Sequence, residues 1–415
     1  MDSVIVVGAS LAGWRATEAL RAEGFTGKIT LIGEERHLPY DRPPLSKQVL
    51  AGTWPPEKAV LADKKRSSEL QVHEVLGRRA VRLDVDDRAV EVDDGTVFRA
   101  DGIVLATGAA PRRLPSTESL GPREGLFVLR TLDDSLALRA AVTALEESRV
   151  VVIGAGFIGS EVASTCATLG CRVTVLEIMD IPLANVVGPL VGAHCASLHG
   201  ANGVELRAGV KVAGIEKVDA AGGDPRPGLA VRLVDDEVLE ADVVVVGIGV
   251  APSTEWLEGS DLELDNGVVC DDSLYAAEGI VAAGDMARWF WRHDEFEEFI
   301  RIEHWEVAAN AGLAAARSLL VGRNDAPAFT PVPYFWSDQY GIRFQMLGNP
   351  GGDDYVEVVE GSFEEGKFVA LYGRAGRLRA AFAIGKPRQL MGYRPLLQAG
   401  CSWGDALSHA ASQAQ

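Results

Sequence analysis

Two stretches of the chain share one pattern, a short apolar run followed at once by closely spaced glycines. The first stretch runs from Ser3 to Gly13 and the second from Arg149 to Gly159. In each, the apolar run predicts a buried strand, the glycines predict a tight turn, and the following residues predict a helix. The repeat therefore predicts a pair of β-α-β units of the nucleotide-binding kind.

An acid ends the second predicted strand of each unit. These strands are expected at Lys28 to Ile32 and at Arg172 to Leu176. Glu34 lies 26 residues after the first glycine of its unit, and Glu177 lies 23 residues after its own. An acid at about this distance binds the ribose of a dinucleotide. Glu34 is the expected ribose acid of the first unit, with Glu35 as a rival.

The second turn matches the full dinucleotide pattern, with Gly154, Gly156 and Gly159. The first glycine allows the tight turn, the second lets backbone approach a pyrophosphate, and the third permits close helix packing. The helix start then offers its free N–H groups and positive dipole end to the phosphates. A purely structural turn is the alternative. In the first turn, Ser10 replaces the middle glycine, and a serine is small and can donate to a phosphate.

Two dinucleotide sites in one chain imply two dinucleotides, and in a redox protein the natural pair is a bound flavin and a diffusing nicotinamide. Glu177 favours NADH over NADPH, because a carboxylate holds ribose hydroxyls but opposes a 2′-phosphate. No Lys or Arg occurs between Glu177 and Arg207 that could neutralise the charge of a 2′-phosphate. That Glu177 merely caps its strand is the alternative.

Charge and apolar runs exclude several other classes of protein. The chain has 40 Lys and Arg against 59 Asp and Glu, a net charge of −19, so a nucleic-acid partner is not expected. Asp2 stands where a secretory signal would carry Lys or Arg, and the longest apolar run, Val243 to Val250, is too short to span a membrane. Five cysteines are few and odd in number, as in a reducing compartment. We expect a cytoplasmic protein with no metal site.

One cysteine pair, Cys166 and Cys171, has the spacing of a flavoprotein redox disulfide. Cys166 falls in the middle of a predicted helix that ends at Gly170, and Cys171 opens the next strand. If both residues were helical, a five-residue step would turn them about 140° apart. We therefore interpret the pair as small core residues.

Further apolar runs complete the predicted domains, which are an α/β pair of Rossmann-like nucleotide-binding domains and an α+β tail. The bounds expected are 1–115 and 246–325 for the two parts of an FAD-binding domain, 116–245 for an NAD-binding domain, and 326–415 for a C-terminal interface domain. In the tail, the short β-type runs are Tyr355–Val359, Phe368–Leu371 and Leu378–Ile384.

Six short segments, in this order, resemble one known family across nearly the whole chain. They are Tyr40-Asp-Arg-Pro-Pro-Leu-Ser-Lys47, Leu105-Ala-Thr-Gly108, Leu129-Arg-Thr-Leu132, Ala283-Gly-Asp285, Arg301-Ile-Glu-His-Trp305 and Phe335-Trp-Ser-Asp-Gln339. The chain resembles the putidaredoxin reductase-like family of FAD-dependent NADH:ferredoxin reductases. These enzymes serve bacterial cytochrome P450s and Rieske oxygenases. The resemblance implies a fold of the glutathione-reductase type.

The resemblance also implies which residues contact the cofactors. It places Glu34 on the FAD ribose, Ala80 near the adenine, Asp285 on the ribityl chain and Lys47 near the flavin ring. Arg130 and Trp305 are expected to contact FAD as well. The alternatives to cofactor contact are that Arg130 is a surface charge and that Trp305 is an aromatic residue packed in the core. The full set of expected cofactor-binding residues is Gly8, Ser10, Leu11, Ala12, Gly13, Glu34, Arg42, Lys47, Ala80, Thr107, Gly108, Arg130, Gly284, Asp285, Trp305, Gly154, Gly156, Phe157, Ile158, Gly159, Glu161, Glu177 and Gly247.

By the same resemblance, Lys47 pairs with Glu161, and the pair lies at the flavin N5 and holds the nicotinamide amide. These two residues are the expected catalytic residues. Either charge would be costly in a closed site if it were unpaired, so the presence of one supports the presence of the other. Val307 and Gly385 depart from the family, which often has asparagine at both places, and they put local flavin or sheet contacts in doubt.

The sequence as a whole predicts a flavoprotein that takes hydride from NADH onto FAD and passes single electrons to a [2Fe-2S] or similar ferredoxin. No cluster of cysteines could hold iron and sulfur here, so the cluster must sit on the partner. A rubredoxin reductase, a nitrite-reductase-linked flavoprotein and a non-enzymatic NADH sensor are the alternatives. A disulfide or peroxide reductase would need a cysteine in the segment 36–47, which has none.

A basic stretch near the end of the chain suggests where the acceptor docks. Residues 371–415 hold six basic residues against the single acid Asp405, in a chain whose net charge is −19. Arg377 and Arg379 are two apart on a predicted strand and would share one face. We expect this face to bind an acidic ferredoxin, with Trp336, by resemblance, as the exit for electrons. A solvated strand face is the alternative.

Overall fold

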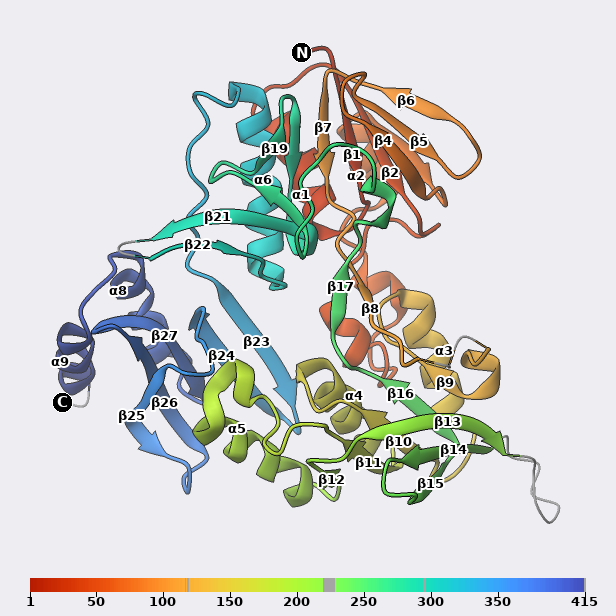
Figure 1. The fold of residues 1–415 in the computed structure, drawn as a ribbon, viewed down its shortest axis with the longest axis vertical. Helices are drawn as coiled ribbons and strands as arrows, with labels where there is room; N and C mark the ends of the chain where they lie inside the picture. The colour runs from red at the N-terminus through yellow and green to blue at the C-terminus, as the bar shows by residue number, and fades with distance from the viewer. Residues whose placement is uncertain (116, 118, 219–227, 294–295, 414–415) are drawn as a thin grey trace. The chain divides into compact units, whose positions relative to one another are not determined.

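A computed structural model describes residues 1–115, 117, 119–218, 228–293 and 296–413, and these form two compact units (Figure 1). Unit 1 consists of Met1–Asp41, Ala59–Ala110 and Ala251–Phe335. Unit 2 consists of Arg42–Lys58, Pro111–Val250 and Trp336–Gln415. The chain passes between the units five times, and two of these crossings fall within β8 (Ala109–Pro111) and β17 (Val250–Pro252).

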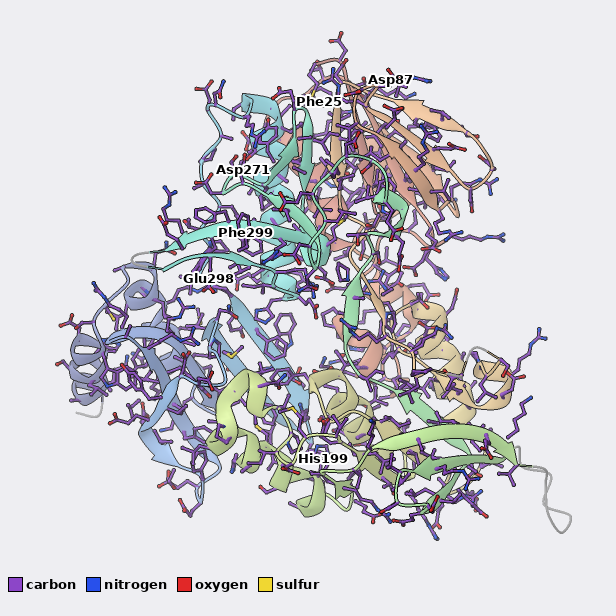
Figure 2. The ribbon with its side chains drawn as sticks, viewed as in Figure 1. Phe25, Asp87, His199, Asp271, Glu298 and Phe299 are labelled. Atoms are coloured by element: carbon purple, nitrogen blue, oxygen red, sulfur yellow. The ribbon has the colours of Figure 1, made fainter. Side chains whose placement is uncertain are left out.

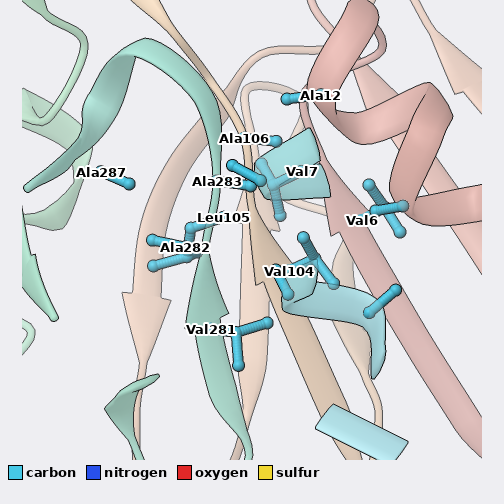
Figure 3. Close-up of a cluster of buried hydrophobic side chains, with 14 of the residues drawn as sticks. Val6, Val7, Ala12, Val104, Leu105, Ala106, Val281, Ala282, Ala283 and Ala287 are labelled. Carbon is cyan, nitrogen blue, oxygen red and sulfur yellow. The ribbon is translucent and has the colours of Figure 1, made fainter. Parts of the chain in front are cut away.

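Unit 1 is built on a six-stranded sheet with the order β19-β20-β7-β1-β2-β3. Its strands are β1 (Ser3–Val7), β2 (Lys28–Gly33), β3 (Val72–Leu76), β7 (Gly102–Leu105), β19 (Tyr275–Ala277) and β20 (Ile280–Ala282). All neighbours run parallel except β19, which is antiparallel to β20. Because parallel strands are covered on both faces, β1 and β7 read as continuous apolar runs and are buried (Figure 3).

Two helices of unit 1, α1 (Leu11–Ala22) and α6 (Trp305–Val321), pack against each other beside this sheet. Two smaller antiparallel elements complete the unit. One is the sheet of β4 (Ala80–Asp84), β5 (Ala89–Val92) and β6 (Val97–Arg99). The other is the hairpin of β21 (Ala287–His293) and β22 (Phe296–Ile300), on which β18 (Val268–Cys270) pairs. Short helices are α2 (Lys64–Glu69), η5 (Glu255–Leu257) and η6 (Gly284–Met286).

Unit 2 repeats the same plan around a five-stranded parallel sheet with the order β12-β11-β10-β16-β9. These strands are β9 (Leu126–Phe127), β10 (Arg149–Ile153), β11 (Arg172–Leu176), β12 (Glu205–Arg207) and β16 (Val243–Val246). Its helices are η1 (Pro43–Ser46), η3 (Pro122–Glu124), α3 (Leu132–Val142), α4 (Phe157–Thr168) and α5 (Ala184–Ala201). The hairpin strands β13 (Val212–Val218), β14 (Gly228–Leu233) and β15 (Val238–Ala241) form an antiparallel sheet.

The C-terminal part of unit 2 is an antiparallel sheet with the order β23-β24-β27-β26-β25, followed by three helices. The elements are β23 (Tyr334–Gln339), β24 (Ile342–Gly348), β25 (Tyr355–Ser362), β26 (Lys367–Arg374), β27 (Arg377–Ile384), α7 (Pro387–Gly392), α8 (Arg394–Gln398) and α9 (Trp403–Gln413). The predicted fold class, two Rossmann-like domains with an α+β tail, is thereby confirmed. The four-part division of the chain stays a prediction.

Among the described residues, no helix is both long enough and apolar enough to cross a membrane.

Candidate active site

The first glycine turn joins β1 to α1 in unit 1. Gly8 has a φ of +119°, and its N–H donates to the carbonyl of Ile32 over 2.8 Å. A Cβ on Gly13 would lie 1.8 Å from the carbonyl oxygen of Gly8, so only glycine permits this approach of helix to strand. The helix begins at Leu11 with Ser10 as its N-cap residue. The turn therefore has the geometry that a phosphate-binding helix start requires.

The second glycine turn, between β10 and α4 in unit 2, separates its three glycines by role. A Cβ on Gly154 would meet the carbonyl oxygen of Gly247 at 2.3 Å, and one on Gly159 would meet that of Gly154 at 2.0 Å. By contrast, a Cβ built on Gly156, the N-cap residue of α4, would meet no atom of the described residues within 4 Å other than those of its chain neighbours. Gly154 and Gly159 are thus required by packing, whereas Gly156 leaves open space at the helix start. A pyrophosphate fits this arrangement.

Glu177 follows β11 and holds the second glycine turn through its side chain. It is 9% exposed, its Oε2 accepts from the N–H of Ala155 at 2.7 Å, and its Oε1 accepts from the N–H of Met179 at 2.9 Å. A carboxylate has about four acceptor positions, so two remain for the hydroxyls of a ribose. Arg207 donates to the exposed carboxylates of Glu205 and Glu237 at 2.8 and 2.6 Å. Arg207 is the first Lys or Arg after Glu177, and its guanidinium is already paired with these two carboxylates.

Glu161 lies on α4, is 2% exposed and pairs with Lys47. Its Oε2 accepts from Lys47 Nζ and from Ser46 Oγ, each at 2.6 Å. Its Oε1 accepts from Ser337 Oγ at 2.6 Å and from the N–H of Asp338 at 3.3 Å. The ion pair expected from the resemblance is confirmed; its role at the flavin stays a prediction.

All four acceptor positions of Glu161 are therefore occupied by groups of this chain. Lys47 Nζ also donates to the carbonyl of Pro43 at 3.1 Å. A nicotinamide amide that donates to Glu161 has to displace one of the four donors, and the N–H of Asp338 makes the longest of these bonds. Sequence reasoning missed Ser46 and Ser337, although both lie inside the segments that carry the family resemblance.

Arg42 and Arg130 also meet in unit 2, where the Arg42 guanidinium donates to the carbonyl of Arg130. Arg130 immediately precedes α3, whose start is fixed by a capping box. The Thr131 hydroxyl accepts from the N–H of Asp134 at 3.1 Å, and the Asp134 carboxylate accepts from the N–H of Thr131 at 2.8 Å. The reciprocal bonds fix where the Arg130 backbone lies.

In unit 1 the expected flavin residues lie around the carboxyl ends of β7 and β20. Thr107 donates its hydroxyl to the carbonyl of Ser253 at 2.9 Å, and Arg301 donates to the carbonyl of Asp285 at 2.9 Å. Trp305 Nε1 donates to Asp41 Oδ1 at 2.5 Å, and burial raises the pKa of Asp41. Carboxyl ends of parallel strands are where open α/β sheets bind ligands.

The remaining expected FAD residues of unit 1 come from several of its elements. Glu34 is exposed just after β2, Ala80 is buried at the start of β4, and Gly108 follows Thr107. Gly284 has a φ of +74° at the start of η6, beside Asp285. The rival acid Glu35 accepts from the Tyr40 hydroxyl. Of the two acids, Glu34 is the one whose side chain is exposed.

The structure brings the two cysteines of the C-x4-C pair together at the end of α4. Gly170 has a φ of +86°, and the N–H of Cys171 donates to the carbonyl of Cys166 at 3.1 Å. This is a Schellman turn, in which the first residue beyond the turn folds back over the last helical turn. Hydrogen bonding to Cys171 raises the pKa of the Cys166 thiol, and burial adds to the rise. The 140° separation of a continuous helix is thus not realised, because Cys171 lies outside the helix. All five cysteines are free.

The proposed basic docking face is wrong in one respect, because Arg379 is only 6% exposed. It lies on β27, a central strand whose last seven residues are all buried. Arg374 pairs with Asp354 at 2.6 Å, and Lys386 pairs with Glu360 at 2.7 Å. Two-residue spacing gives a shared face, but here both faces of the strand are covered. Arg377 and Arg379 therefore do not form an exposed patch.

Comparisons with known proteins agree with this architecture. The family described as pyridine nucleotide-disulphide oxidoreductase matches residues 2–312, and the reductase C-terminal family matches residues 334–412. Rhodocoxin reductase of Rhodococcus erythropolis is 35% identical over 396 residues, covering 95% of this chain and 89% of that protein. The ferredoxin–NAD(+) reductase component of the anthranilate 1,2-dioxygenase system of Burkholderia cepacia is 37% identical over 405 residues, covering 96% and 95%.

Among solved structures, the covalent putidaredoxin reductase–putidaredoxin complex matches with a TM-score of 0.89 at 30% identity, covering 100% of this chain and 99% of that one. The chain therefore belongs to the pyridine nucleotide-disulphide oxidoreductase family and carries its reductase C-terminal domain. It is an oxidoreductase with a fold of the glutathione-reductase type.

Proposed function

We infer that this protein is an NADH-dependent, FAD-containing ferredoxin reductase. The observation that carries this function is the presence of two glycine turns, each between a buried strand and a helix start and each with an acid after the next strand. A bound flavin accepts a hydride and returns two electrons one at a time, which is what a nicotinamide donor and an iron–sulfur acceptor require. The partner is a [2Fe-2S] or similar ferredoxin that supplies a cytochrome P450 or Rieske oxygenase.

In this proposal unit 1 holds FAD. The start of α1 at Gly8–Gly13 binds the pyrophosphate, and the exposed Glu34 binds the ribose. Asp285, at the carboxyl end of β20, binds the ribityl chain. His304 supports a flavin nearby, because its Nδ1 is buried with no hydrogen-bond partner among the described residues, and burial lowers its pKa to about 4. A buried polar atom of this kind calls for a ligand or water.

Unit 2 holds NADH in the same proposal. The open side of Gly156 receives the pyrophosphate, with Phe157 and Ile158 in the first turn of α4. Ile158 is 52% exposed, which leaves apolar surface for a nucleotide to cover. Glu177 binds the adenosine ribose through its two remaining acceptor positions. Lys47 and Glu161 orient the nicotinamide amide, and no general base is needed, because hydride transfer depends on the position of the two rings.

Among the alternatives, the named relatives favour a ferredoxin or ferredoxin-like acceptor over rubredoxin or nitrite reductase. A non-enzymatic NADH sensor is disfavoured because those relatives are reductases. A cytoplasmic location also belongs to this proposal, supported by the five free cysteines. Fractionation of cells that produce the protein tests the location, and recovery outside the cytoplasm would contradict it.

The experiment that tests the function uses the purified protein with its flavin. It should be yellow and should bleach on addition of NADH under anaerobic conditions. Cytochrome c reduction is then measured with a panel of ferredoxins and rubredoxins. Turnover with at least one ferredoxin, well above the rate without a carrier, is expected. A protein that bleaches but works only with rubredoxins would establish the alternative, and one that does not bleach would refute the proposal.

A further inference from the structure

A buried histidine of unit 2 links the C-terminal sheet β23–β27, called the tail sheet below, to the glycine turn between β10 and α4. His199 lies on α5 and is 2% exposed (Figure 2). Its Nδ1 is 2.7 Å from the hydroxyl of Tyr340, and its Nε2 is 3.3 Å from Ser160 Oγ on α4. Both ring nitrogens are thus partnered by hydroxyls that come from different elements of the unit.

Only one assignment of donors and acceptors gives each of these three side chains its hydrogen bonds. Burial lowers the pKa of His199 to about 4, so the ring is neutral near pH 7 and has one donor and one acceptor. Burial also raises the pKa of Tyr340, so its phenol keeps the proton. Tyr340 therefore donates to Nδ1, Nε2–H donates to Ser160, and the Ser160 hydroxyl points to the carbonyl of Ala155 at 3.5 Å.

The last residue of this series belongs to the second glycine turn. The N–H of Ala155 donates to Glu177 Oε2 at 2.7 Å. A continuous hydrogen-bonded series therefore runs from Tyr340 through His199, Ser160 and Ala155 to Glu177. Fully satisfied buried networks of this kind rigidify the groups that they connect.

Tyr340 also has an unusual backbone, which is an independent sign that its place is fixed by its contacts. It has a φ of +54° and Gly341 has a φ of +73°, in the two-residue turn between β23 and β24. Such hairpin turns favour asparagine or glycine at both positions. Its own N–H donates to Ser164 Oγ of α4 at 2.7 Å. A strained conformation persists only where the surroundings hold it.

We propose that Tyr340, His199 and Ser160 are positioning residues for the NADH site, which act by fixing the orientation of Glu177 through its bond to the glycine turn. The proposal rests on the proposed function, since it assumes that NADH binds at this turn. It gives the tail sheet a part in nucleotide selectivity through residues that do not touch the nucleotide.

The test measures NAD+ binding to the flavin-loaded protein by calorimetry, together with the ratio of kcat/KM for NADH to that for NADPH. Tyr340→Phe removes one hydroxyl and keeps the ring. Tyr372→Phe is the matched control, because Tyr372 is buried and its hydroxyl donates to the carbonyl of Val187 on the same helix α5 at 2.8 Å. Both changes remove one buried hydrogen bond between the tail sheet and α5.

Tyr340→Phe and Ser160→Ala should each weaken NAD+ binding by about three- to tenfold and lower the NADH preference, while Tyr372→Phe changes either by less than about twofold. In a Glu177→Ala background, Tyr340→Phe should have no further effect, since Glu177 ends the series. Equal effects of Tyr340→Phe and Tyr372→Phe, or a Tyr340→Phe effect that survives without Glu177, would overturn the proposal. A wild-type protein that does not prefer NADH would instead refute the nucleotide assignment itself.

Discussion

At the scale of single residues, Glu161 and Glu177 of unit 2 differ in how many of their acceptor positions are occupied. Glu161 receives four donors from its own chain, and Glu177 receives two. Glu161 is therefore held in one orientation by the protein, whereas Glu177 keeps capacity for a ligand. This difference gives each acid a separate test.

Ser337→Ala should lower the free energy of unfolding by about 2 kcal/mol. The change removes a 2.6 Å hydrogen bond to a carboxylate that is 2% exposed, and such a charged acceptor cannot recover the bond from water. Urea unfolding of the flavin-loaded protein measures the change. Ser408→Ala is the control, since its exposed hydroxyl bonds only within α9, and it should stay within about 0.5 kcal/mol of wild type. Equal losses in both variants would contradict the assignment.

We expect the preference for NADH over NADPH to depend on Glu177. The wild-type kcat/KM for NADH should exceed that for NADPH by at least about 100-fold, which corresponds to about 3 kcal/mol. Glu177→Ala and Glu177→Arg should narrow the ratio, because they remove the charge that opposes a 2′-phosphate. Glu216→Ala, a change in an exposed acid paired with Arg232 on the neighbouring strand, should leave the ratio intact. NADPH equal to or better than NADH in the wild type would show that the ribose assignment is wrong.

At the scale of elements, His199 connects α5, α4 and the turn after β23, which are far apart in the sequence. Its ring is desolvated, and desolvation is the only cause of its lowered pKa. The unfolded chain therefore binds a proton near pH 6.5, but the folded chain does not bind one until about pH 4. The folded state is thus stabilised fully above about pH 6.5, and this stabilisation is lost as the pH falls toward 4.

When the pH is lowered from 7 to 5, the titration of His199 should reduce the free energy of unfolding by about 2 kcal/mol. Chemical denaturation of wild type and His199→Gln at both pH values measures this contribution. The glutamine variant is less stable at pH 7, but its own loss between the two pH values should be smaller by about that amount. Identical losses in the two proteins would mean that His199 does not titrate as its burial implies.

At the scale of the whole molecule, the cysteines do not provide the redox disulfide that the name of the pyridine nucleotide-disulphide oxidoreductase family suggests. Three of its five free cysteines, Cys166, Cys195 and Cys270, are buried, and burial raises the pKa of Cys195 to about 12. Buried thiols with a raised pKa are poor nucleophiles. The exception is Cys171, whose pKa is lowered by its hydrogen bond with Cys166, but both thiols lie at the far end of α4 from the glycine turn. The proposed electron path therefore needs no thiol.

A variant with all five cysteines changed to Ser or Ala should keep its NADH-to-acceptor rate within about twofold, measured per bound flavin. The rate is expected to persist because hydride and electron transfer depend on the two nucleotides and the acceptor. Inhibition of the wild type by a thiol reagent, absent only when Cys166 or Cys171 is replaced, would instead assign the pair to turnover.

The sequence by itself determined what local patterns encode. Glycine spacing, apolar runs and the acid after each second strand predicted both β-α-β units and the fold class, because strand, turn and helix preferences act over a few neighbouring residues. The family resemblance predicted one distant contact, the Lys47–Glu161 ion pair, and only the tertiary structure decided which other distant groups meet. His199 and Tyr340 gave no signal in the sequence, Cys171 folds back over Cys166 through a turn, and Arg379 is buried in a central strand. Contacts of this kind depend on how elements pack, and no short sequence pattern specifies that packing.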